Sequence, residues 1–417
     1  MTGWARAVAM IALAAVAACK TPTARPTTTS ADATMGAPED AVAHPPDAAV
    51  ARCGPSPGPA LAPGRATGAA AVLTDGTIVM GGRSTMGGWS AILDPALGTM
   101  VDVVVPGAIA AIRMVRAGDA IVMLGSADGL DPATAAVRFD PQTRRWRKPM
   151  SVPRCATAGD HGELNVTVEP IALGDGTVLV VGDRCALVLD ANGIWTETAP
   201  LVRQRRGFTL IGLRNGDVLR VGGLAWAEGD GGLEASTVVD RYEVATRRWV
   251  AAASAHYMRY HQAAVRLSDG RVLVIGGCED SGTICHSESR PAPPPEIYDP
   301  VRDRWTVLGG APVTNRERAT LTALPDGRVV VLGGFVDEAG SLPPTGVLDG
   351  DRWFALPPLA DDRGGQVAVS AGDHVLFSGP LGQGGLPPLE WYGVAADCPA
   401  TQVELVPARP PVGGSYP

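Results

Sequence analysis

One short pattern recurs along this chain and limits what it can fold into. It consists of an apolar segment, an Asp-Gly or Asn-Gly pair, a second apolar segment and then one or two glycines. An Asp-Gly or Asn-Gly pair between apolar segments is typical of a two-residue β-hairpin turn. Close copies lie at residues 72–82, 172–183, 212–223, 266–277 and 323–334, and looser copies lie at 116–125 and 370–379. The sequence therefore predicts seven hairpins along the chain.

The second strand of each hairpin is apolar throughout, as in Val272 to Ile275. A strand with one face in water alternates apolar and polar side chains, so these strands are expected to be covered on both faces. The chain also contains 52 glycines and 36 prolines in 417 residues. Because that composition disfavours long helices and favours short strands joined by turns, we expect an all-β protein.

A second motif follows the hairpin in most copies. Residues 297–305 read as a strand, a turn at Asp299-Pro300 and then a tryptophan, Trp305. The same or a looser spacing ends at Trp146, Trp195, Trp249 and Trp353. Each unit is therefore expected to hold four strands, and residues 65–408 divided among seven units give about 49 residues each. A single four-stranded sheet cannot bury both faces, whereas sheets arranged radially cover one another.

An apolar strand that ends in Gly-Gly, followed by a Tyr-Asp-Pro-like turn and a tryptophan, resembles the kelch repeat of bacterial lipoproteins and of the galactose-oxidase family. The resemblance covers residues 61–410 and implies a kelch-type β-propeller of seven four-stranded blades. Two units lack the double glycine and one lacks its tryptophan, so six blades stay possible. Residues 401–406 alternate like an outer strand, whereas residues 53–64 are rich in proline. We therefore expect the C-terminal segment to complete the last blade, and residues 411–417 to be a tail.

The first 18 residues resemble the signal peptide of a bacterial lipoprotein. Their apolar run, Ala7 to Ala18, is at about twelve residues too short to span a membrane. It leads into Cys19 through small residues, as in a lipobox, so Cys19 would be lipidated; an ordinary signal peptide is the alternative. Residues 19–60 hold few large apolar side chains and are expected to form a disordered tether. These features predict a lipid-anchored protein of the bacterial cell envelope, in the periplasm or on the outer surface.

Six cysteines remain after Cys19, and an even number in an oxidising compartment suggests three disulfides. Their spacing offers the pairs Cys53–Cys398, Cys155–Cys185 and Cys278–Cys285. The first pair would join the two ends of the folded domain. For Cys278 and Cys285, with the neighbouring His286, zinc binding is the alternative, although their spacing fits no zinc pattern.

An arginine stands about ten residues before several hairpin turns, at Arg65, Arg205, Arg259 and Arg316. In kelch domains this position lies near the mouth of the central channel. The resemblance implies that these guanidinium groups could bind carboxylates or phosphates of a ligand, since arginine makes bidentate contacts with both. The alternative is structural: each arginine would pair with the backbone or a carboxylate of a neighbouring blade.

Residues 256–261 hold the side-chain types that a copper radical oxidase of the galactose-oxidase type would need, namely His256, His261, Tyr257 and Tyr260. Adjacent positions on one strand point to opposite faces, and the other units do not offer the missing ligands. We expect no metal and no cofactor, and we expect the repeated tryptophans to pack the blades.

The formal charge of −8 disfavours a nucleic-acid partner. Functional residues commonly lie on loops over a rigid frame, and the longest loops expected here are residues 82–90, 224–236 and 278–295. The sequence favours a non-catalytic scaffold that binds a protein or a glycan on one propeller face. The alternative is a carbohydrate-active enzyme, such as an epimerase or a mutarotase resembling the periplasmic kelch mutarotases of sialic acid. Its candidate carboxylates are Glu163, Glu317 and Asp362.

Overall fold

The computed structural model describes residues 53–127, 133–154, 168–226, 233–279, 292–309, 316–334, 345–359, 367–378, 389–405 and 407. Strands dominate these ranges, and the helical element η1 (Pro106–Ala108) is a single 3₁₀ turn. Within the described ranges, no helix has the length and apolar character needed to cross a membrane. The all-β class expected from the sequence is confirmed.

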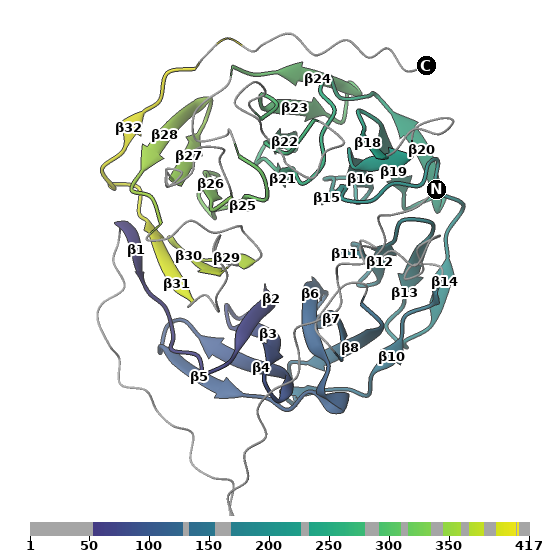
Figure 1. The fold of residues 1–417 in the computed structure, drawn as a ribbon, viewed down its shortest axis with the longest axis vertical. Helices are drawn as coiled ribbons and strands as arrows, with labels where there is room; N and C mark the ends of the chain where they lie inside the picture. Colours follow the sequence, from purple (N-terminus) through teal and green to yellow (C-terminus); the bar gives the residue numbers. More distant parts are fainter. Residues whose placement is uncertain are drawn as a thin grey trace, which may run out of the picture. The chain divides into compact units, whose positions relative to one another are not determined.

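The strands form seven radial sheets, which we number as blades 1 to 7 (Figure 1). Blade 1 holds β2 (Ala66–Val72), β3 (Ile78–Ser84), β4 (Gly87–Asp94) and β5 (Thr99–Asp102). Blade 2 holds β6 (Ala110–Ala117), β7 (Ala120–Ser126) and β8 (Ala135–Asp140), with an outer strand divided into β9 (Arg145–Trp146) and β10 (Met150–Ser151). Blade 3 holds β11 (Glu169–Ala172), β12 (Val178–Val181), β13 (Ala186–Leu189) and β14 (Trp195–Glu197).

Blade 4 holds β15 (Thr209–Gly212), β16 (Val218–Val221), β19 (Val239–Glu243) and β20 (Arg248–Ala252), with an inserted hairpin of β17 (Leu224–Trp226) and β18 (Leu233–Ala235). Blade 5 holds β21 (Ala263–Arg266), β22 (Val272–Ile275), β23 (Glu296–Asp299) and β24 (Arg304–Val307). Blade 6 holds β25 (Thr320–Ala323), β26 (Val329–Leu332), β27 (Thr345–Asp349) and β28 (Arg352–Leu356), extended by β32 (Thr401–Gln402). Blade 7 holds β29 (Val367–Ala371), β30 (His374–Ser378) and β31 (Glu390–Val394), and its fourth strand is β1 (Cys53–Pro57).

The innermost strands of successive blades contact one another in a closed cycle that returns from β29 to β2. The apolar side chains follow the same cycle, because each main core cluster combines residues of two adjacent blades. Val122 and Val180 share one such cluster between blades 2 and 3, and Ile78 and Leu376 share another between blades 1 and 7. Covering by neighbouring blades explains the wholly apolar second strands, since all four residues of β22 are buried.

The hairpin turns have one recurring geometry. In blade 5, Leu267 N donates to Arg271 O (2.8 Å) and Gly270 N donates to Leu267 O (3.0 Å). Asp269 Oδ1 accepts the backbone N–H of Arg271 at 2.9 Å. Gly270 has φ +95°, a conformation that glycine adopts without a steric penalty. These contacts give each residue type of the Asp-Gly signature a physical role.

The repeated tryptophans connect each blade to the one before it. Trp305 on β24 packs on Tyr298 with ring centroids 5.1 Å apart, and its Nε1 donates to Ala253 O of blade 4 at 2.7 Å. Trp249 of blade 4 donates in the same way to Thr198 of blade 3 at 3.2 Å. These side chains are buried. They therefore pack the blades.

The ring closes differently from the sequence-based expectation. Blade 7 is completed by the N-terminal strand β1, which pairs antiparallel with β31 from Cys53↔Val394 to Pro57↔Glu390. Gly58 N donates to Leu389 O, so the alternate positions Pro55 and Pro57 direct their nitrogen atoms away from β31. Prolines are tolerated at such sites on an outermost strand, because no N–H is needed there. The propeller thus begins at Cys53, inside the segment expected to be tether.

The expected outer strand at residues 401–406 has another position. Thr401 and Gln402 form β32, which pairs with Ala355 and Phe354 on β28 and so extends blade 6. Our expectation that this segment completes the last blade was wrong, because β1 already occupies that edge. The disulfide Cys53–Cys398 is confirmed and links β1 to the segment between β31 and β32.

Candidate functional site

The meander within each blade sorts the loops onto two faces of the ring. The Asp-Gly hairpins and the turns before the outer strands lie on one face, because both follow strands that run in the same direction. The loops between the second and third strands, and the segments that connect successive blades, therefore lie on the other face, which we call the loop face. Loops over a rigid frame are the usual place for function, so the candidate site is sought there.

Three inter-blade segments on the loop face share one backbone form. Each holds a buried arginine four positions before the next innermost strand, and a residue with positive φ follows two positions after the arginine. The three pairs are Arg205 with Gly207, Arg259 with His261, and Arg316 with Arg318. The positive-φ residues are linked by hydrogen bonds from His261 N to Gly207 O (3.4 Å) and from Arg318 N to His261 O (3.1 Å). Blades 4, 5 and 6 are thereby joined where their innermost strands begin.

The arginine of blade 4 is bonded within its own blade. Arg205 Nη2 donates to Asp240 Oδ2 at 2.5 Å and Nη1 donates to Gly222 O at 2.6 Å. Arg220 on β16 donates from Nε to the same Asp240 oxygen at 2.9 Å. Burial and the nearby Arg220 together lower the pKa of Arg205 to about 10, against the opposing effect of Asp240. The guanidinium group thus stays charged at neutral pH and is enclosed.

Blade 5 repeats this arrangement with a glutamate. Arg259 Nη2 donates to Glu296 Oε2 on β23 at 2.6 Å and to Pro294 O at 3.0 Å. The other oxygen of Glu296 lies 2.9 Å from His256 Nδ1 and accepts the backbone N–H of His256 at 2.8 Å. Burial lowers the pKa of Arg259, and the Glu296 charge opposes that effect. His256 is therefore engaged with the buried ion pair.

The remaining two arginines differ from each other. Arg316 is buried and donates to Gly333 O at 2.9 Å, and burial lowers its pKa to about 9. Arg65 lies in blade 1, where it makes a bidentate pair with Asp102 on β5 (2.6 and 2.7 Å) over the ring of Trp89. The guanidinium groups of Arg205, Arg259 and Arg316 are all enclosed, and each one donates to an oxygen of its own blade.

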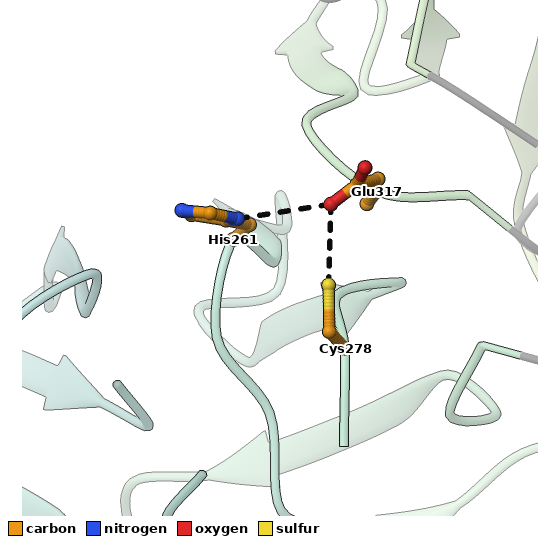
Figure 2. A group of neighbouring side chains, drawn as sticks. All are labelled: His261, Cys278 and Glu317. Carbon is orange, nitrogen blue, oxygen red and sulfur yellow. Dashed lines mark hydrogen bonds and ion pairs between the residues drawn. The ribbon is translucent and has the colours of Figure 1, made fainter. Parts of the chain in front are cut away.

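A cluster of possible ligand atoms lies on the loop face at the junction of blades 5 and 6 (Figure 2). Glu317 Oε2 lies 3.7 Å from His261 Nδ1 and 3.2 Å from Cys278 Sγ. His261 and Glu317 come from successive inter-blade segments, and Cys278 directly follows the double glycine of β22. Figure 2 shows the ring and the sulfur directed at the same carboxylate oxygen.

The cluster leaves hydrogen-bonding capacity unused. His261 Nδ1 is buried and makes no hydrogen bond, although the side chain as a whole is 31% exposed. Cys278 is disulfide-bonded, with its partner outside the described residues, so its sulfur carries no hydrogen to donate to Glu317. The contact between Sγ and Oε2 therefore brings two lone-pair-bearing atoms together. A proton or a cation would stabilise such an arrangement.

The structure brings together residues that the sequence suggested for separate roles. His261 was weighed as a copper ligand, Glu317 as an enzymatic carboxylate and Cys278 as a disulfide partner, but their proximity was not predicted. The repeat could have indicated this proximity. His261 and Glu317 follow the equivalent arginines of adjacent units, two positions after Arg259 and one after Arg316.

The other candidate residues do not join the ligand cluster. Tyr257 and Tyr260 are buried, the Tyr260 ring lies 4.7 Å from the His261 ring between centroids, and His256 contacts Glu296. Among the described residues, the His261 cluster is the one group of three or more such ligand side chains. Cys185 is also disulfide-bonded, and the pairings proposed for Cys185 and Cys278 stay predictions. Six of the candidate residues lie outside the described ranges: Cys19, Cys155, Glu163, Cys285, His286 and Asp362.

Comparison with known proteins gives structural but no sequence relatives. No protein-family model matches the chain. No curated protein matches it either. Among solved structures, it is similar to a catalytically inactive virginiamycin B lyase from Staphylococcus aureus with quinupristin, at TM-score 0.56 and 8% identity over 81% of this chain and 98% of that one.

Two further structures have the same kind of likeness. A streptogramin B lyase has TM-score 0.54 and 10% identity over 81% of this chain and 96% of its own. A fungal alcohol oxidase of the AA5 family, in complex with copper, has TM-score 0.50 and 15% identity over 82% of this chain and 85% of its own. Identities this low show the fold alone. Taken with the seven radial sheets, the likenesses show that the chain is a seven-bladed β-propeller.

Proposed function

We propose that this chain is a kelch-type propeller of the bacterial cell envelope that binds a protein or glycan ligand on its loop face, without catalysis. The observation that carries the proposal is the His261–Glu317 pair, whose side chains are 31% and 17% exposed. A buried ring nitrogen with no hydrogen-bond partner is costly, and it is expected where a ligand completes the contact.

The proposed location rests on cysteine chemistry. Cys53 and Cys398 are joined, and Cys185 and Cys278 are also disulfide-bonded. Disulfides persist in secreted and periplasmic proteins and are rare in the cytosol. Lipidation of Cys19 would add the membrane anchor. Replacing Cys19 with serine is expected to move the protein from the membrane fraction to the soluble fraction of fractionated cells, and retention on the membrane would contradict the anchor.

The ligand proposal is tested with immobilised full-length protein on a glycan array and in a pull-down from surface extracts. The wild type is expected to retain a ligand, and Glu317→Gln and His261→Ala are each expected to weaken retention by about tenfold or more, as loss of a buried polar contact does. The control is Asp269→Asn, because Asp269 lies in a hairpin turn on the opposite face. No retained ligand, or equal retention by all variants, would contradict the proposal.

A second candidate function uses the same pair. A carboxylate beside an imidazole can transfer protons to and from a substrate, which is the chemistry that an epimerase or a mutarotase requires. The 3.7 Å separation of His261 Nδ1 and Glu317 Oε2 is the observation that favours it. Interconversion of a retained sugar, followed by NMR of its anomeric protons, would support the enzyme; retention without interconversion supports the scaffold.

A further inference from the structure

The atoms of the His261 cluster lie close enough together to bind one ion. One atom each from His261, Cys278 and Glu317 lie within 4.8 Å of one another. In a tetrahedral zinc site, bonds of about 2.0–2.3 Å place neighbouring ligand atoms about 3.4–3.6 Å apart. The separations of 3.2 Å for sulfur to oxygen and 3.7 Å for nitrogen to oxygen bracket that range.

We propose that reduction of the disulfide holding Cys278 converts this cluster into a binding site for zinc or a similar borderline-soft divalent cation. The ligands are the Cys278 thiolate, His261 Nδ1 and Glu317 Oε2. The proposal goes beyond ligand binding on the loop face and does not depend on it, since it needs only these three side chains.

The backbone holds the three residues in place before any ion binds. Cys278 N donates to Tyr260 O at 2.9 Å and Tyr260 N donates to Cys278 O at 3.1 Å, which fixes Cys278 beside the segment of His261. Arg318 N donates to His261 O at 3.1 Å, which fixes the segment of Glu317 against His261. Ligands on a preorganised backbone bind an ion without a large ordering cost.

The disulfide keeps Cys278 from binding a metal as the third ligand. The thiolate, and not a disulfide sulfur, is the form in which cysteine binds metals. Two electrons from a phosphine reductant break the S–S bond, one water supplies the oxygen of the resulting phosphine oxide, and the two protons of that water go to the two protein sulfurs. The cation then displaces the proton of Cys278 into solvent. One thiolate and one carboxylate balance the charge of a divalent ion.

Burial and exposure favour an ion with an open position. Cys278 is 1% exposed, so the sulfur side of the site is dry. The partly exposed side chains of His261 and Glu317 leave the opposite side to water. Three protein ligands with one open position are typical of catalytic zinc rather than structural zinc. A mixed sulfur, nitrogen and oxygen set also favours zinc or cobalt over magnesium or calcium.

The test is a cobalt titration of the full-length protein before and after reduction. A phosphine reductant is added without oxygen until alkylation and mass spectrometry find Cys278 as a thiol. The reduced protein is expected to develop a sulfur-to-cobalt charge-transfer band in the near ultraviolet, and the oxidised protein is expected to show none. A free Cys278 thiol without that band would overturn the proposal, as would a thiol that cannot be freed without unfolding the protein.

Matched variants identify the ligands. His261→Ala and Glu317→Gln are each expected to weaken cobalt binding by at least about tenfold, and Cys278→Ser is expected to abolish the band. Cys185→Ser removes another disulfide cysteine, and His374→Ala removes a histidine from a hairpin on the opposite face; both should keep the band. A band that survives in Cys278→Ser, or that is insensitive to His261 and Glu317, would assign the metal to other residues.

Discussion

The buried carboxylate Asp240 lies between two buried guanidinium groups, those of Arg205 and Arg220. All three side chains are fully enclosed, so their charges are stabilised by one another and by backbone carbonyls rather than by water. Breaking a buried pair leaves an uncompensated charge, which costs far more than the pair itself contributes.

Asp240→Asn is therefore expected to lower the free energy of unfolding by about 3–5 kcal/mol. Urea denaturation followed by tryptophan fluorescence measures the change. Asp351→Asn is the control, because its carboxylate is 99% exposed, and its denaturation midpoint should match the wild type. A loss below about 1 kcal/mol would mean that the site reorganises or admits water.

Asp190 gives a pH-dependent prediction at the same scale. The backbone N–H of Ile194 donates to Asp190 at 2.8 Å and, with that of Asn192, lowers the carboxyl pKa. A lowered folded pKa adds stability above the unfolded value of about 3.9, and this contribution is lost as the pH falls through the folded pKa. Asp190→Asn is thus expected to show a lower thermal midpoint than the wild type at pH 7, with a deficit that shrinks below pH 4. A deficit independent of pH would contradict this reasoning.

The sequence located several residues of the loop face but not their orientation. Arg205, Arg259 and Arg316 recur once per unit, which marked them as equivalent. Their carboxylate partners could not be identified, because Asp240 and Glu296 follow their arginines by 35 and 37 residues on the third strand. Whether such an arginine faces a ligand or the blade interior depends on that distant strand, which a local pattern does not encode.

At the scale of strands and turns, the hairpin pattern predicted most of the fold. Asp-Gly turns and apolar second strands follow from local chemistry, and β22 and β26 lie where the pattern placed them. β1 was missed because its prolines disfavour pairing in general, whereas an outermost strand exposes alternate nitrogen atoms. Whether a strand is outermost in its sheet depends on the tertiary structure. The proline content alone therefore wrongly predicted that this segment would not pair.

The glycines after the second strands make a prediction at this scale. Gly222 has φ +61°, and a Cβ there would lie 2.4 Å from Arg259 O of the next blade. Gly350 has the same φ, but a Cβ there would meet nothing within 4 Å. Gly222→Ala is expected to destabilise the protein more than Gly350→Ala, which bears only the left-handed backbone cost of about 1–2 kcal/mol. Denaturant midpoints of the two variants test this, and equal losses would exclude close packing as the reason for the double glycine.

At the scale of the whole propeller, its first strand is tied to its C-terminal part at blade 7. β1 supplies the outer strand of blade 7, and the Cys53–Cys398 disulfide spans 345 residues. A crosslink over so long a loop restricts the unfolded chain strongly, by about 6 kcal/mol in the chain-entropy model. Ring closure thus rests on a strand pairing and a covalent bond together.

Replacing Cys53 and Cys398 together with serine is expected to lower the free energy of unfolding by about 2–5 kcal/mol, which is typical for loss of a native disulfide. Guanidinium denaturation of the double variant and the wild type, both non-reduced, measures the difference. Far-ultraviolet circular dichroism should stay unchanged, because β1 keeps its hydrogen bonds to β31. An unaltered midpoint would show that strand pairing alone closes the ring.

Because β1 is synthesised first and its partner β31 is synthesised near the end of the chain, β1 stays unpaired during most of translation. Cys53 leaves the ribosome 345 residues before Cys398, and at about 5–20 residues per second the nascent strand waits roughly 20–70 s for its neighbour. During that interval it is an open edge that could pair with another nascent chain. Pro55 and Pro57 remove two N–H donors from the edge that faces away from β31, so the residues that made β1 hard to identify also limit strand pairing at the edge that stays outermost after β31 is made.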